Sequence, residues 1–145
     1  MHEVFNTTMI HTADAVTSWE EAIRLSAKPL LKADKIENRY IDKMIENVYI
    51  MGPYIVIAPG LAFAHARPED GVKSLGLSML RLQNPVKFSE MAHHEVQIVL
   101  TLAAPDQNGH LELLSKLSQV FSEENAIQKI LTFSEEDVVN FIKGE

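Results

Sequence analysis

Two histidines and one arginine are the side chains in this sequence best suited to chemistry on an anion. His65 ends a short apolar run in YIVIAPGLAFAHARPEDGV (residues 54–72) and enters a polar, turn-rich segment. A neutral imidazole can act as a nucleophile near pH 7, and Arg67 could hold an anion through its fork of donors. Each has a structural alternative. The nitrogens of His65 could bind loop backbone, and Arg67 could form a solvated ion pair with Glu69 or Asp70.

His110 lies in APDQNGHLELLSKL (residues 104–117), where leucines recur at helical spacing. The Asn-Gly pair could indicate a hairpin, but the leucines favour a helix with Asp106 or Asn108 as its N-cap. His110 would then lie in the first turn, where free N–H groups and the helix dipole favour an anion. The structural alternative is an exposed histidine in a capping turn.

Composition narrows the possible functions. The 145 residues predict a single domain over 1–145, and the absence of cysteine removes thiolate chemistry. A net charge of −7 disfavours binding to nucleic acid. Neither a GxGxxG motif nor a P-loop occurs, and the sequence HHE at residues 93–95 lacks the spacing of a zinc motif, so we expect no cofactor or metal. Without a secretory signal or an apolar run of spanning length, the chain is expected to be cytoplasmic.

Helices are predicted before and after the central part of the chain, and these elements must position the three side chains. Residues 17–34 open with Ser18 three residues before Glu21, the spacing of a capping box. Pro29 should kink this helix or end it early. The other predicted helices contain Ile36 to Val48 and stop at Gly52-Pro53, follow Pro105, or open at Ser122 and Ser134.

Short apolar runs bounded by Pro, Gly or Asn predict strands in the centre of the chain. They are Tyr54 to Ala58, Leu75 to Leu82 and Val96 to Ala103, with a shorter candidate at Met9 to Thr12. This order predicts an α/β fold, a mixed β-sheet sandwiched between α-helices. We therefore expect His65, at a strand end, and His110, at a helix start, to converge at one rim of the sheet.

The segment MGPYIVIAPGLAFAHARPEDGVKSLGLSMLRLQNPVKF (residues 51–88) resembles the active-site region of a known family. It is similar to the type-2 enzyme IIA (EIIA) domains of the bacterial phosphoenolpyruvate:sugar phosphotransferase system (PTS), the mannitol/fructose family, and most of all to its ascorbate branch. The resemblance includes the preceding helix pair and the histidine-headed helix at His110. Relatives often have Pro-His and His-Gly where this chain has Ala64-His65 and His65-Ala66.

The resemblance implies a phosphoryl relay. His65 would accept a phosphoryl group from phosphorylated HPr and pass it to an EIIB component, often onto a cysteine, for sugar uptake through the membrane component EIIC. His110 would be the second active-site histidine, and Arg67 a further contact to the anion. No metal or nucleotide is required. A homo-oligomer is compatible with the sequence.

Two alternatives keep the same residues. A regulatory EIIA-like protein would use the phosphorylation state of His65 to control a partner. A non-catalytic binding domain would use both histidines only for structural hydrogen bonds.

Overall fold

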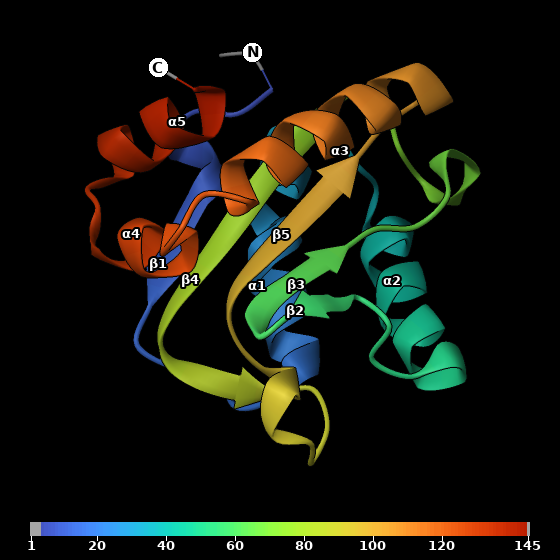
Figure 1. Ribbon diagram of the computed structural model, residues 1–145. Helices are drawn as coiled ribbons and strands as arrows, with labels where there is room; N and C mark the ends of the chain where they lie inside the picture. The colour runs from blue at the N-terminus through green and yellow to red at the C-terminus, as the bar shows by residue number, and fades with distance from the viewer. Residues whose placement is uncertain (1–3, 145) are drawn as a thin grey trace.

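A five-stranded mixed sheet is the centre of the molecule, in a computed structural model that describes residues 4–144 (Figure 1). Its strand order is β1-β4-β5-β3-β2. β1 pairs parallel with β4 and β3 parallel with β5, whereas β4–β5 and β2–β3 are antiparallel. The strands are β1 (Ile10–Ala13), β2 (Val56–Ala58), β3 (Gly60–Ala64), β4 (Gly76–Lys87) and β5 (Glu95–Ala103). The predicted mixed sheet is confirmed.

The strand β4 runs past Leu82, where the sequence predicted its end. Its pairing with β5 is interrupted after Arg81 and resumes at Val86, so Pro85 falls inside the irregularity. A proline is tolerated there because no ladder hydrogen bond needs its missing N–H. The strand prediction therefore ended too early, at Leu82.

Two helices cover one face of the sheet: α1 (Trp19–Lys32) and α2 (Asn38–Met51) (Figure 1). Ser18 caps α1 by accepting the N–H of Glu21 at 3.1 Å, as its spacing predicted. Of the two effects expected of Pro29, a kink or an early end, the early end is wrong, because α1 continues to Lys32. Pro29 lies near the C-terminal end of α1, so its missing N–H removes only one helical hydrogen bond. The next residue, Leu30, is fully buried in the core, which favours continuation of the helix.

The other face carries α3 (Gln107–Phe121), α4 (Ala126–Thr132) and α5 (Glu135–Lys143), with α3 crossing in front of β5 in Figure 1. Asp106 is the N-cap of α3, accepting the N–H of Gly109 at 2.8 Å. Ser134 caps α5 as predicted. The expectation that a helix opens at Ser122 is wrong, because Ser122 ends α3 and α4 begins after Asn125, which adopts φ 61°. Helices on both faces confirm the predicted sandwich.

The parallel pairing of β3 with β5 determines where the two histidines meet. Ala64 lies opposite Thr101 in this register, so the two strands end at the same edge of the sheet. The chain leaves β3 at His65, and it leaves β5 through residues 104–106 into α3. This edge therefore receives both a strand end and a helix N-terminus.

Candidate functional site

His65 is half-buried directly after β3. The chain turns from β2 into β3 at Gly60, whose φ of 90° is readily available only to glycine. Nδ1 of His65 lies 3.2 Å from the carbonyl oxygen of Phe63. A carbonyl can only accept, so this hydrogen bond places the ring proton on Nδ1 and leaves the lone pair on Nε2. The ring of Tyr54 meets the imidazole edge-on, with centroids 6.0 Å apart.

His110 lies in the first turn of α3, and its ring is brought beside that of His65. The two ring centroids are 6.0 Å apart, and the rings are inclined at 58°. Burial lowers the pKa of His110, and the positive charge that His65 would carry when protonated lowers it further. A lowered pKa keeps His110 neutral near pH 7, so it can donate one hydrogen bond without adding charge.

Arg67 lies two residues beyond His65, and its side chain is exposed. Its backbone N–H donates to Oδ2 of Asp70 at 3.1 Å, at the start of a short 3₁₀ turn, Pro68–Asp70. Within the described part of the chain, its guanidinium makes no ion pair with Glu69 or Asp70, so the structural alternative of a solvated ion pair is wrong. The guanidinium donors are therefore available to solvent or a ligand.

Arg67 and His110 line one cavity of about 250 Å³ at this edge of the sheet. Tyr40 of α2 also lines it, with 1% of its surface exposed. Its hydroxyl donates to the carbonyl oxygen of Leu102 at 2.7 Å and accepts the N–H of Ala66 at 3.0 Å. In the predicted helix from Ile36 to Val48, Tyr40 has the spacing of the apolar face, which assigns no role to its hydroxyl. The available signal was its hydroxyl, which needs a partner when buried.

The loop that follows His65 is tied to the connection between α1 and α2 and to the first turn of α2. Glu37 donates its N–H to the carbonyl of Gly71 at 2.9 Å, and the guanidinium of Arg39 donates to the carbonyl of Glu69 at 2.9 Å. Lys73 pairs with Asp34 at 2.6 Å. These contacts hold the end of the loop that lies away from His65, residues 69–73. The hydroxyl of Tyr40 holds the end beside His65 through the N–H of Ala66.

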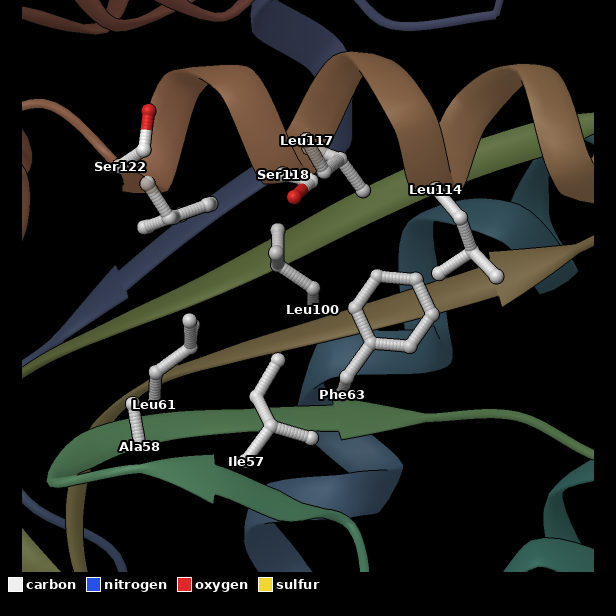
Figure 2. Close-up of a pocket in the computed structure, with 10 residues that line it drawn as sticks. Ile57, Ala58, Leu61, Phe63, Leu100, Leu114, Leu117, Ser118 and Ser122 are labelled. Atoms are coloured by element: carbon white, nitrogen blue, oxygen red, sulfur yellow. The ribbon is translucent and has the colours of Figure 1, made fainter.

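A mostly apolar groove of about 380 Å³ runs along α3 (Figure 2), and neither His65 nor His110 is among the residues that line it. Phe63, whose ring centroid lies 6.0 Å from that of His65, lines it from β3. Leu114, one turn beyond His110, lines it from α3. Ile57 of β2 lines the opposite wall and is 61% exposed. An exposed apolar surface that continues from a polar site is typical of protein docking.

The other histidine pair lies elsewhere. His93 and His94 form a short 3₁₀ turn before β5, at the end of that strand opposite to α3. Their rings contact each other, and Nδ1 of His94 hydrogen-bonds the hydroxyl of Ser89 at 2.6 Å. Across residues 4–144 no group of three or more His, Asp or Glu side chains is arranged to hold a metal ion. Over the same residues, no helix has the length and apolar character needed to cross a bilayer.

The geometry suits transfer of an anionic group through His65. The Nε2 lone pair is free to attack, the neutral ring of His110 is at contact range, and Arg67 offers donors at the same edge. The N–H groups of Gln107 and Asn108 have no acceptor within α3 because they lie in its first turn. This set of donors could stabilise the charge of a transferring phosphoryl group.

Comparison with known proteins agrees with this geometry. The family "Phosphoenolpyruvate-dependent sugar phosphotransferase system, EIIA 2" matches residues 3–145. The ascorbate-specific PTS EIIA component of Escherichia coli K12 is 37% identical over 132 residues, covering 90% of this chain and 85% of that protein. The corresponding component of Salmonella typhimurium LT2 is 40% identical over 108 residues, covering 74% of this chain and 70% of that protein.

Solved structures share the fold. The mannitol-specific cryptic phosphotransferase enzyme IIA CmtB of E. coli superimposes with a TM-score of 0.86 at 29% identity, covering 98% of this chain and 96% of that one. Enzyme IIA-mannitol of E. coli, in its complex with phosphorylated enzyme IIB-mannitol, superimposes with a TM-score of 0.82 at 22% identity. That alignment covers 97% of this chain and 98% of that one, and it bears on the fold alone. The chain is therefore a phosphotransferase component that belongs to the EIIA 2 family of the phosphoenolpyruvate-dependent sugar phosphotransferase system.

Proposed function

We propose that His65 accepts a phosphoryl group from phosphorylated HPr and passes it to an EIIB component. One observation carries the proposal: the carbonyl of Phe63 holds Nδ1 of His65, which leaves Nε2 as the nucleophile beside His110. Histidine suits a reversible relay because phosphohistidine keeps a high transfer potential, which a serine phosphate ester would lose.

The transfer balances without a further reactant. Nε2 of His65 forms a bond to phosphorus as the phosphorus–nitrogen bond of the donor's phosphohistidine breaks. Each ring keeps its other N–H, and for His65 this is the Nδ1–H that Phe63 accepts. In the second step a nucleophile of EIIB, in the family often a cysteine thiolate, attacks phosphorus. The Nε2–phosphorus bond then breaks and returns a neutral His65.

The neighbouring donors would act on the transferring group itself. Charge spreads over the three equatorial oxygens in a loose transition state, so alignment and fixed donors supply most of the catalysis. His110 can donate one N–H, and the first-turn N–H groups of α3 can donate from its N-terminus. Arg67 is exposed and makes no ion pair in the described residues, which suits a contact formed only when the anion arrives.

The apolar groove of Figure 2 would receive the protein partners. Both partners must bring a phosphorylated or reactive side chain to Nε2 of His65, and Phe63, which lines the groove, has its ring centroid 6.0 Å from that of His65. The exposed side chains of Tyr54, Ile57 and Leu111 surround the same region and are 40%, 61% and 54% exposed. Membership of the EIIA 2 family supports EIIB as one partner.

The curated relatives support ascorbate as the sugar, because they are named ascorbate-specific components. The sugar would be taken up by an EIIC component, which this chain would serve through EIIB without touching it. The relevant EIIB for testing is therefore the ascorbate type.

The proposal is tested by incubating the protein with enzyme I, HPr and labelled phosphoenolpyruvate. We expect one phosphoryl group per chain, labile in acid and stable in alkali, as phosphohistidine is. His65→Ala should take up no label, and circular dichroism checks that this variant is folded. An unlabelled wild-type protein, or full labelling of His65→Ala, would contradict the assignment and favour a non-catalytic binding domain.

A further inference from the structure

We infer that Tyr40 is a positioning residue for the phosphoryl relay: its buried hydroxyl sets the backbone at His65 relative to the strand that leads to His110. The inference rests on the proposed function for its effect on transfer. The hydrogen bonds that carry it are independent of that function.

The hydroxyl of Tyr40 joins two segments that are distant in the sequence. It accepts the N–H of Ala66, the peptide group directly after His65, at 3.0 Å. It donates to the carbonyl oxygen of Leu102, near the end of β5, at 2.7 Å. One oxygen atom thus connects the exit of β3 to the end of β5. A phenylalanine at this position would keep the ring and remove both bonds.

The two joined segments are the ones that carry the histidines. The Ala66 bond restrains the peptide plane on the C-terminal side of His65, and the Phe63 carbonyl restrains its ring from the N-terminal side. Leu102 is followed closely by Asp106, the N-cap of α3, and α3 carries His110 in its first turn. The hydroxyl therefore acts on the relative placement of the two rings without touching the phosphoryl group.

Burial makes the connection rigid. Tyr40 is 1% exposed, and burial raises its pKa to about 12, so the hydroxyl keeps its proton and its donor role at neutral pH. Loss of the hydroxyl would leave the N–H of Ala66 and the carbonyl of Leu102 without that partner. The exit of β3 would then gain freedom, because a buried backbone group that loses its partner no longer holds the chain in place.

The test compares Tyr40→Phe with Tyr49→Phe, a matched control on the same helix. Tyr49 also hydrogen-bonds through its hydroxyl, but to Glu20 on the surface. Phosphoryl transfer from HPr is followed by rapid quench over a range of HPr concentrations. We expect the maximal rate of Tyr40→Phe to fall roughly tenfold or more, because misplacement of reacting groups by about 1 Å can cost about a hundredfold. The HPr concentration at half-maximal rate should change little, and Tyr49→Phe should match wild type.

A spectroscopic measurement separates positioning from a loss of stability. In folded Tyr40→Phe, the amide signal of Ala66 and the imidazole nitrogen signals of His65 should shift in NMR spectra, while signals of β1 stay in place. Wild-type maximal rates in folded Tyr40→Phe, or an equal loss in Tyr49→Phe, would overturn the inference. So would a rate loss in Tyr40→Phe with unchanged His65 and Ala66 signals.

Hydrogen exchange on the wild-type protein tests the same bond without a variant that must fold. The amide of Ala66 lies in a loop, yet we expect it to be protected as strongly as amides within α2, because its acceptor is a buried hydroxyl. Exchange as fast as that of an exposed loop amide would overturn the inference. A failure of the proposed function would look different, since the wild-type protein itself would then take up no phosphoryl group.

Discussion

Nδ1 of His65 lies 3.2 Å from the carbonyl oxygen of Phe63, two residues earlier in the chain. The contact is local, so the end of β3 itself fixes which ring nitrogen carries the proton. This leaves a lone pair on Nε2, the nucleophile of the proposed relay, and the ring centroids of His65 and His110 lie 6.0 Å apart. The proposed chemistry of the site depends on this one tautomer.

Replacement of His110 should slow phosphoryl transfer without abolishing it. In His110→Ala the nucleophile and the Phe63 contact remain, so His65 still accepts phosphate from HPr. Removal of one positioned donor to a developing charge costs on the order of 10²–10³ in rate, and the first-turn N–H groups of α3 would reduce that cost. Rapid-quench measurements should show the loss in transfer from HPr and in transfer to EIIB. Wild-type rates in a folded His110→Ala protein would return His110 to a structural role.

Phosphorylation should change the titration of His110. In the free protein, burial and the neighbouring His65 lower the pKa of His110 from its ordinary value of 6.5. A phosphoryl group on His65 places negative charge at contact range, which favours the protonated ring and should raise the pKa. NMR titration of the His110 imidazole in both forms measures the shift. Equal midpoints, or a lower midpoint in the phosphorylated form, would contradict this arrangement of charges.

The same lowered pKa predicts how the stability of the unphosphorylated protein depends on pH. A histidine with a depressed pKa binds fewer protons in the folded than in the unfolded state. Its contribution to the free energy of unfolding is therefore complete above the unfolded pKa of 6.5 and is lost as pH falls through the lower folded pKa. Urea denaturation from pH 8 to pH 5 should show His110→Gln losing less stability than wild type on acidification. An identical pH dependence would contradict the shift.

Ile57 should contribute to partner binding through the groove beside His65. It is 61% exposed and lines the wall formed by β2, so Ile57→Ser removes apolar surface from the groove and little from the core. Burial of such a side chain stabilises a complex by roughly 1.5–3 kcal/mol, so the partner concentration at half-maximal rate should rise about tenfold or more. The maximal rate should stay near that of wild type. An unchanged concentration dependence for both HPr and EIIB would place docking elsewhere.

The meeting of His65 and His110 could be predicted from the sequence in part, because the signal at each residue was local. An apolar run ending at a histidine and a capped helix starting near another place both residues at ends of elements. The parallel register that brings those ends to one edge is a long-range pairing, and the sequence could only suggest it. The residues around His65 were the main basis for predicting the family.

Other features depended on contacts that no local pattern records. Tyr40 has the spacing of a core residue, and only the folded chain brings Ala66 and Leu102 to its hydroxyl. The start of α4 after Asn125 depends on a left-handed backbone conformation, and residue type alone could not select it because both Ser122 and Asn125 are common N-cap types. An ion pair at Arg67 was plausible because acidic residues follow it. In the structure, the carboxylate of Asp70 instead accepts the backbone N–H of Arg67, and the backbone carbonyl of Glu69 accepts from the guanidinium of Arg39.

The relay itself is tested most directly by a chase experiment. Protein phosphorylated through enzyme I, HPr and labelled phosphoenolpyruvate is purified and mixed with an ascorbate-type EIIB, and the label on each chain is followed with time. We predict that label leaves His65 and appears in equal amount on EIIB, and that none is transferred from a His65→Ala preparation treated in the same way. Label that stays on this chain in the presence of a competent EIIB, or is released only as inorganic phosphate, would contradict the relay.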